Sequence, residues 1–332
     1  MQSEQFAIDQ KKADLDYYWD SYSTINIHEQ MIKDHIRTHT YEKAITKCDI
    51  KGKIVLDVGC GLGILSLFAA RAGAKHVYAI ERAKIGDKAI QVIKNNGYED
   101  VITVIRGRVE DIELPVDKVD IIISEWMGYN LLYESMLGSV LYARDKWLKK
   151  GGLILPDKCS MYINAIEDEW YYDNKINFWR NVYGFNMTPM RKEVLKEPLV
   201  DSLKSSTIAT NDCCIMTIDI NTMKYEDQCF TSPFKIKAFR EEFIYAFSTW
   251  FDVSFPQSGE VLTTSPYKTM THWHQSMFYL DEPITVAVGD VIEGTYSLKF
   301  NETNPRFLDV TITYQFNGAF HTAKGSMDYQ MQ

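Results

Sequence analysis

Two glutamates lie nine residues apart in the chain, Glu125 two residues after an apolar run and Glu134 beyond a glycine. Two carboxylates held close together repel each other, which raises one pKa unless a cation lies between them. A guanidinium group fits such a pair because it is planar, permanently charged and donates bidentate hydrogen bonds to carboxylates. On spacing alone, coincidence explains the pair better, so its meaning depends on the surrounding sequence.

A glycine-rich turn precedes the glutamates. Gly59, Gly61 and Gly63 follow an apolar run that contains Asp57, and they lead directly into a helical pattern. Glycines permit a tight strand-to-helix turn and close approach of a ligand, and the helix N-terminus offers free N–H donors. A dinucleotide fingerprint needs its last glycine at position 64, which is Ile64. The spacing instead resembles the first motif of class I methyltransferases, in which an acidic residue precedes the glycines.

Two further carboxylates follow the next apolar runs. Glu81 ends the second run, about twenty residues after the glycines, where a carboxylate can bind both ribose hydroxyls of a nucleoside. Glu110 follows the third run, at the position that contacts the adenine ring in such folds. Taken alone, Glu110 would be an ordinary surface acid. Together with the glycine turn, the two carboxylates predict a cofactor that contains adenosine.

The elements that position these residues alternate between strands and helices over residues 53–155. Such alternation predicts βαβ units and a parallel sheet, and the unbroken apolar runs indicate strands buried on both faces. The predicted strands cover residues 54–58, 76–80, 101–105, 119–123 and 153–155, and the predicted helices cover 62–72, 85–95 and 135–147. The fold class predicted for this part is therefore α/β.

Beyond Pro156 the helical patterns largely disappear and short strand candidates dominate, which is typical of an antiparallel β barrel or sandwich. These candidates cover residues 161–166, 213–219, 234–239, 246–253, 284–288, 292–300 and 308–316. One helical segment interrupts them, because residues 167–185 contain seven aromatic side chains. It is either a packing helix of the core or, given its density of aromatic residues, a subunit interface.

Composition narrows the class of protein. The 332 residues carry 36 basic and 45 acidic side chains, a net charge of −9. This length favours two domains. The acidic balance argues against a general nucleic-acid binder and either attracts a cationic partner or only maintains solubility.

No apolar run reaches the roughly 18 residues of a transmembrane helix, and the polar N-terminal residues do not resemble a signal peptide. Six scattered cysteines without a C-x-x-C pair are expected to be reduced thiols in an intracellular protein.

The segment around the glutamates reads Ser124-Glu125-Trp126-Met127-Gly128-Tyr129 and then Tyr133-Glu134-Ser135-Met136. It resembles the double-Glu loop of the protein arginine methyltransferases, and the resemblance extends over essentially the whole chain. It is strongest to the predominant type I enzymes of eukaryotic cells, which form asymmetric dimethylarginine. One departure is Trp19, where those enzymes have phenylalanine.

The resemblance implies a Rossmann-like class I methyltransferase sheet followed by an antiparallel β-barrel domain with an inserted helical dimerisation arm. Residues 1–40 would form a helical segment that closes over cofactor and substrate, and 41–155 the cofactor domain. Residues 156–332 would form the barrel, with the arm at about 167–190.

The resemblance also implies roles for single residues. Glu125 and Glu134 would hold the substrate guanidinium, and His272 paired with Asp34 would complete the catalytic set. Met31 and Trp273 would shape the substrate pocket. The residues implied to bind S-adenosylmethionine, with S-adenosylhomocysteine as product, are Tyr18, Tyr22, His28, Arg37, Asp57, Gly59, Gly61, Glu81, Glu110 and Met136, with Arg37 on the cofactor carboxylate.

No metal is implied. Without the resemblance, His272 and His274 would suggest at most half of a metal site.

The implied reaction is in-line methyl transfer to arginine in Arg/Gly-rich RNA-binding proteins and histone tails. A homodimer through the arm is implied, with no direct nucleic-acid or membrane contact, and residence in nucleus and cytoplasm is expected. Two alternatives stay open: a class I methyltransferase acting on another acceptor, and an inactive scaffold that binds Arg-rich proteins. Ile64 and the double-Glu loop disfavour a nicotinamide dehydrogenase.

Overall fold

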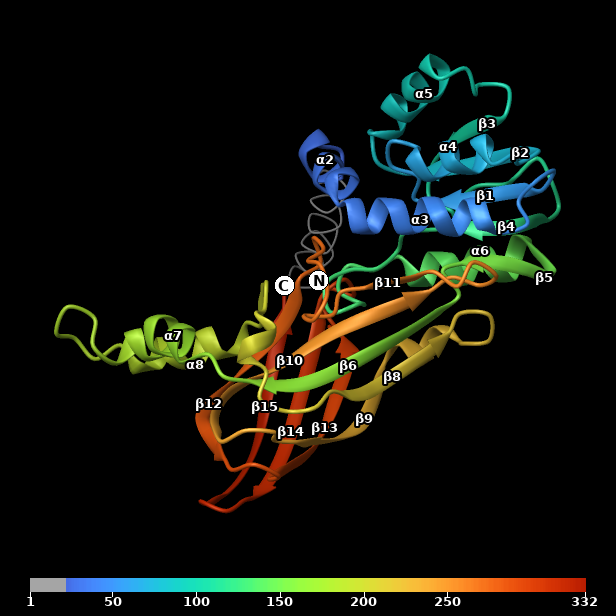
Figure 1. The fold of residues 1–332 in the computed structure, drawn as a ribbon. Coiled ribbons are helices and arrows are strands. Elements are labelled where there is room, and N and C mark those ends of the chain that lie inside the picture. The colour runs from blue at the N-terminus through green and yellow to red at the C-terminus, as the bar shows by residue number, and fades with distance from the viewer. Residues whose placement is uncertain (1–21) are drawn as a thin grey trace, which may run out of the picture.

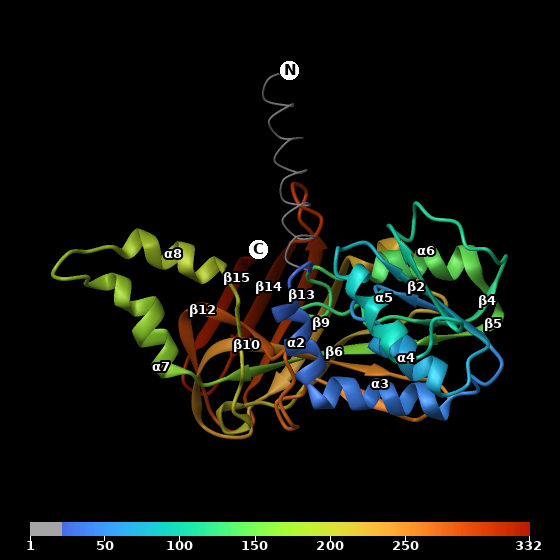
Figure 2. The same cartoon turned by 90° about the horizontal axis from the view of Figure 1, so that it is seen from above.

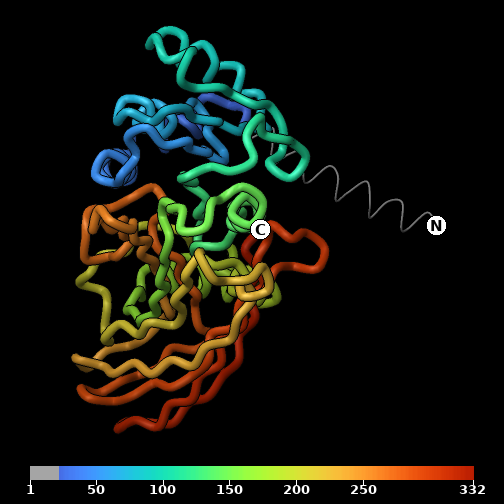
Figure 3. Tube along the Cα trace, turned by 90° about the vertical axis from the view of Figure 1, so that its right-hand side faces the viewer, coloured from blue at the N-terminus to red at the C-terminus, as the bar shows by residue number. Residues whose placement is uncertain are grey.

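The computed structural model describes residues 22–332, so Tyr18 and Trp19 lie outside the described residues. A parallel-sheet domain is stacked on a larger antiparallel domain (Figures 1 and 3), and a helical arm projects from the antiparallel domain (Figure 1). No helix within the described residues is long and apolar enough to cross a membrane.

Two helices, α2 (Ile25–Lys33) and α3 (His35–Lys47), begin the described chain. Asp34 separates them and starts α3, because its carboxylate accepts a hydrogen bond from the backbone amide of Arg37 at 2.9 Å, as a good N-cap residue does. Tyr41 and Ile45 of α3 are fully buried against the core. The helices are thus fixed to the domain on which the site is built.

The parallel sheet contains five strands in the order β3-β2-β1-β4-β5. Its strands are β1 (Ile54–Val58), β2 (His76–Glu81), β3 (Ile102–Arg106), β4 (Val119–Ile123) and β5 (Leu148–Leu155), and its helices are α4 (Ile64–Arg71), α5 (Gly86–Asn95) and α6 (Leu137–Trp147). The strand order reverses direction between β1 and β4. Ligands of open α/β sheets bind at the carboxyl ends of the strands at such a point, and this is where the glycine turn and Glu125 begin.

The antiparallel domain contains two sheets, one ordered β7-β12-β10-β6-β8, with β11 on β10, and one ordered β15-β14-β13-β9. Their strands are β6 (Lys158–Ile166), β7 (Leu199–Asp201), β8 (Cys213–Asp219), β9 (Phe230–Lys237), β10 (Glu242–Ser254), β11 (Val261–Thr263), β12 (Gln275–Val286), β13 (Val291–Phe300), β14 (Leu308–Asn317) and β15 (Thr322–Met331). Phe278 of β12 contacts both Tyr296 and Tyr329 of the second sheet. The predicted α/β sheet followed by antiparallel strands is confirmed.

The strand predictions differ from the structure mainly at the C-terminus. The sequence patterns do not predict β15, because its alternating residues are mostly small or polar and only its end buries large side chains, Tyr329 and Met331. The predicted strand at 284–288 is the end of the much longer β12.

The arm consists of α7 (Glu169–Tyr171), a π-helical turn (Tyr172–Ile176), a 3-10 turn (Asn177–Arg180) and α8 (Thr188–Lys196), and it extends away from both sheets (Figure 2). Tyr172 and Ile176 at its base are buried, and buried Arg191 pairs with Asp281 of β12. Tyr183 at the far end is 96% exposed. The aromatic segment therefore serves partly as a packed base and partly as an uncovered tip.

Candidate active site

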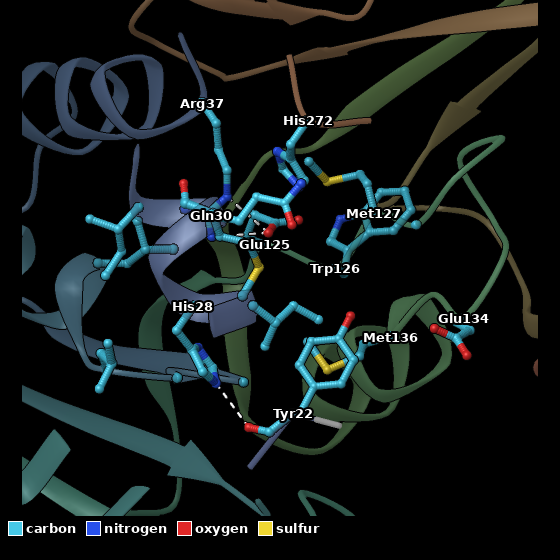
Figure 4. Close-up of a pocket in the computed structure, with 18 of the residues that line it drawn as sticks. Tyr22, His28, Gln30, Arg37, Glu125, Trp126, Met127, Glu134, Met136 and His272 are labelled. Carbon is cyan, nitrogen blue, oxygen red and sulfur yellow. Dashed lines mark hydrogen bonds and ion pairs between the residues drawn. The ribbon is translucent and has the colours of Figure 1, made fainter. Parts of the chain in front are cut away.

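A pocket lies where the N-terminal helices, the carboxyl ends of the parallel strands and a loop of the antiparallel domain meet (Figure 4). Twelve of the predicted site residues line it: Tyr22, His28, Met31, Arg37, Gly59, Gly61, Glu81, Glu125, Glu134, Met136, His272 and Trp273. The fold thus brings together residues that are separated by up to 251 positions in the sequence.

The glycine turn forms one wall. Gly59 has φ 78° and Gly61 has φ 54°, a region that favours glycine. A Cβ atom on Gly59 would lie 2.4 Å from Cε of Met136, so the methionine packs directly on the backbone. His28, whose Nε2 lies 2.9 Å from the carbonyl oxygen of Tyr22, approaches Gly61 in the same way. The turn requires glycine both for its conformation and for these contacts.

Glu81 is tied to the glycine turn. Its carboxylate accepts hydrogen bonds from the backbone amides of Gly61 at 2.9 Å and Ala83 at 2.7 Å. Burial raises the pKa of Glu81, and these hydrogen bonds oppose the rise. The carboxylate predicted to bind ribose therefore lies at the pocket wall, at the end of β2.

Asp57 lies beneath the turn and does not line the pocket. Its side chain is fully buried, where burial raises the pKa to about 7, and it accepts a hydrogen bond from Ser66 Oγ at 2.6 Å. Asp57 therefore lies in a supporting position under the glycines, and its implied contact with the cofactor stays a prediction.

Glu110 lines a neighbouring pocket that shares Gly59, Glu81 and Met136 with the first. Ser139 Oγ donates a hydrogen bond to its carboxylate at 2.6 Å. The residues predicted to bind ribose and adenine thus lie along one continuous wall that passes Met136.

Arg37 forms a buried ion pair with Glu125. Its Nε and Nη2 atoms both lie 3.0 Å from Glu125 Oε2, its Nη1 donates to the carbonyl oxygen of Met31 at 3.2 Å, and both charged side chains are 7% exposed. Glu125 Oε1 is buried and has no hydrogen-bond partner among residues 22–332. Arg37 thus orients one oxygen of Glu125 and leaves the other for a donor, and its implied contact with the cofactor carboxylate stays a prediction.

Glu134 takes a different orientation. Its backbone has φ 54°, and its amide donates to the carbonyl oxygen of Arg306 at 3.0 Å. Figure 4 shows its carboxylate apart from that of Glu125, so the two do not lie side by side in this structure. Burial raises the pKa of Glu134, and the charge of Arg306 opposes the rise.

Asp34 and His272 join the N-terminal helices to the antiparallel domain. Asp34 Oδ2 lies 2.7 Å from Nδ1 of His272 and accepts its backbone amide at 2.9 Å. Burial acts to raise the pKa of Asp34, but the hydrogen bonds from His272 and from the Arg37 amide outweigh it and hold this pKa below its usual value. The pairing implied by the resemblance is present.

Two protein families match this chain in sequence. The family described as "Methyltransferase domain" matches residues 55–152, and "Arginine methyltransferase oligomerization subdomain" matches residues 157–319. Protein arginine N-methyltransferase 1.1 of Arabidopsis thaliana is 50% identical over 96% of this chain and 82% of its own length. Protein arginine N-methyltransferase 1 of Schizosaccharomyces pombe is 50% identical over 91% of this chain and 90% of its own length.

The chain belongs to the protein arginine N-methyltransferase family. The predicted family and enzyme class are therefore confirmed.

Solved structures of this family share the fold. A Trypanosoma brucei PRMT1 enzyme–prozyme heterotetrameric complex with AdoHcy has a TM-score of 0.91 and 41% identity, covering 94% of this chain and 100% of that chain. Arabidopsis thaliana protein arginine methyltransferase 10, in an open conformation, has a TM-score of 0.83 and 30% identity, covering 95% and 99%. The methyltransferase sheet and the antiparallel domain are thus arranged as in known arginine methyltransferases.

Further residues of this methyltransferase hold the double-Glu loop, and the sequence patterns do not single out their contacts. The Tyr41 hydroxyl donates to the Ser124 carbonyl oxygen at 3.0 Å, and Trp273 Nε1 donates to the Met127 carbonyl oxygen at 3.0 Å. Asn130 in the same loop is buried in the antiparallel domain. Their partners are at least 83 positions away, so no local pattern could have identified them.

Proposed function

We propose that this chain uses S-adenosylmethionine to methylate arginine side chains in Arg/Gly-rich proteins and histone tails, forming mono- and asymmetric dimethylarginine. The observation that carries the proposal is the state of Glu125. One of its oxygens is held by Arg37, and the other is buried at the pocket without a hydrogen-bond partner among the described residues. A buried carboxylate oxygen is stabilised by a charged donor, and a guanidinium is a geometrically suitable one.

The residues along the pocket wall fit an adenosine-containing methyl donor. The glycine turn leads into the N-terminus of α4, Glu81 lies beside it, and Glu110 follows beyond Met136. The bound donor supplies an electrophilic methyl group on a sulfonium. The similar Trypanosoma brucei PRMT1 complex was solved with AdoHcy, the demethylated form of this donor, which supports the proposal.

Glu125 and Glu134 would hold the substrate guanidinium so that one nitrogen faces the methyl carbon in line. That nitrogen forms the new C–N bond as the C–S bond breaks, and the guanidinium then loses a proton. For the clamp to form, the Glu134 side chain must turn from the orientation in Figure 4 toward Glu125. Orientation and preorganised charge in a buried site would supply most of the acceleration. His272 is suited to accept the released proton, because it lines the pocket and Asp34 holds its Nδ1 atom.

Met31 and Met136 both line the pocket, and we propose that they direct both methyl groups to the same nitrogen. We also propose that two copies form a homodimer through the arm. The match to an oligomerization subdomain over residues 157–319 supports association, and the exposed arm tip supports this site of contact.

A peptide comparison tests the acceptor. With labelled S-adenosylmethionine, we expect an Arg-Gly-rich peptide to gain label, and the same peptide with lysine in place of arginine to gain none. Lysine lacks the planar, bidentate group that two carboxylates can hold. Equal labelling of the two peptides would favour a methyltransferase acting on another acceptor, and binding of the arginine peptide without labelling would favour a scaffold.

A further inference from the structure

Asn130 lies in the double-Glu loop between Glu125 and Glu134, yet it points into the antiparallel domain instead of the pocket. Its side chain is 5% exposed and does not line the pocket. A buried amide is destabilising unless its polar atoms are hydrogen-bonded. The contacts of Asn130 therefore indicate what the loop is attached to.

Both ends of the Asn130 amide are hydrogen-bonded to barrel strands. Its Nδ2 donates to the hydroxyl of Tyr296 at 2.8 Å, and its Oδ1 accepts from Thr249 Oγ1 at 2.7 Å. Tyr296 is fully buried on β13 and Thr249 is 1% exposed on β10. Because β10 and β13 belong to different sheets, one amide fixes the catalytic loop to both sheets of the antiparallel domain.

The attached loop has a strained backbone. Asn130 has φ 48°, Leu131 has φ 66° and Glu134 has φ 54°, all in the left-handed region. Asparagine tolerates this region, whereas leucine rarely adopts it, so surrounding contacts must hold the loop in place. The loop also turns tightly, because a Cβ on Gly128 would lie 1.5 Å from the Tyr133 carbonyl oxygen.

A second attachment lies beside Glu134. The backbone amide of Glu134 donates a hydrogen bond to the carbonyl oxygen of Arg306, in the loop between β13 and β14. Phe307 of the same loop stacks on Tyr133, with the ring centroids 6.3 Å apart. The antiparallel domain therefore contacts the loop next to a catalytic glutamate as well as at its tip.

We propose that Asn130 is a positioning residue, whose amide, held by Thr249 and Tyr296, fixes the backbone of the loop so that Glu125 stays at the pocket and the Glu134 side chain can turn toward it. This inference rests on the proposed function of the two glutamates. Without the network, the strained segment relaxes and the backbone positions from which the two carboxylates reach the substrate shift. Small misplacements of this kind lower turnover more than they lower ground-state binding.

The test removes single hydroxyl groups outside the pocket. We expect Tyr296→Phe to lower kcat roughly tenfold to a hundredfold, with the Kd for S-adenosylmethionine unchanged and KM for an Arg-Gly-rich peptide changed less than kcat. Thr249→Val removes the other hydroxyl with nearly the same shape and should act in the same direction, which keeps the test available if one variant does not fold.

Tyr329→Phe is the matched control. Tyr329 is also buried in the antiparallel core, and its hydroxyl donates to the Tyr279 carbonyl oxygen at 2.8 Å, without contact to the loop. The Tyr329→Phe variant loses a buried hydrogen bond comparable to the one that Tyr296→Phe loses. It should therefore unfold more easily than the unaltered chain while its kcat stays the same. Equal kcat values for Tyr296→Phe, Thr249→Val and Tyr329→Phe would overturn the positioning role.

Hydrogen exchange separates this inference from the proposed function. The amides of residues 125–136 should exchange faster in Tyr296→Phe than in Tyr329→Phe, whatever the acceptor of the methyl group is. If the unaltered chain methylates no arginine but this difference is found, the proposed function fails and the network still positions the loop. Identical exchange in the two variants would contradict the network's role even in an active enzyme.

Discussion

Replacing Glu134 with glutamine is expected to lower kcat by about a hundredfold to a thousandfold, the effect of removing one preorganised charged group from a buried site. The substitution keeps the shape of the side chain but removes the negative charge that aligns and polarises the guanidinium. The Kd for S-adenosylmethionine should change little, since the donor is proposed to bind the wall formed by the glycine turn and Glu81. Single-turnover kinetics and equilibrium binding measure the two effects separately.

Glu113→Gln provides the control for Glu134→Gln. Glu113 is an exposed acid whose side chain pairs with Lys146, so the loss of its charge should leave kcat unchanged.

The pH dependence of kcat also depends on Glu134. Burial raises the pKa of Glu134, so kcat of the unaltered chain should fall on acidification at a higher pH than an ordinary glutamate would give. A Glu134→Gln variant with normal turnover would contradict the clamp.

The second large effect is expected at the arm tip, where Tyr183→Ser combined with Phe185→Ser should convert a dimer into a monomer. These side chains are 96% and 70% exposed, and Met187 two residues further on is 40% exposed. Exposed apolar side chains that are gathered in one place mark interaction sites, whereas single ones do not. The buried base of the arm is untouched, so the fold should persist. Sedimentation would show the change in mass, and cofactor binding should weaken with it.

Val288→Ser combined with Phe320→Ser is the matched control for the arm. Both side chains are exposed apolar residues, at 70% and 54%, and both lie in connections between strands of the antiparallel domain. This variant should remain a dimer. If the arm variant also sedimented as a dimer, the tip would not be the contact, and the aromatic segment would be only a packing element.

The parallel sheet and the cofactor wall are predictable from sequence because their signals are local. Unbroken apolar runs indicate the five strands, and the glycines place the turn at the end of β1. The place of Glu81 at the end of β2 in the pocket wall can be predicted because the length of one βα unit fixes where the next strand ends. The double-Glu loop is recognisable because its residues are nearly contiguous.

Other features of the site depend on contacts between distant parts of the chain. Arg37 pairs with Glu125 across 88 positions, and Asn130 reaches Tyr296 across 166. The orientation of Glu134 follows from a left-handed backbone held by another loop, which no pattern of residue types indicates. Such features follow from tertiary packing, so only the assembled fold reveals them.

Mass spectrometry of a methylated Arg-Gly-rich peptide tests the central claim most directly. We expect neutral losses characteristic of asymmetric dimethylarginine, with monomethylarginine as the earlier product, because Glu125 and Glu134 hold one guanidinium while both methyl groups reach the same nitrogen. Symmetric dimethylarginine, or a peptide whose arginines remain unmodified while another residue gains the methyl groups, would contradict the account.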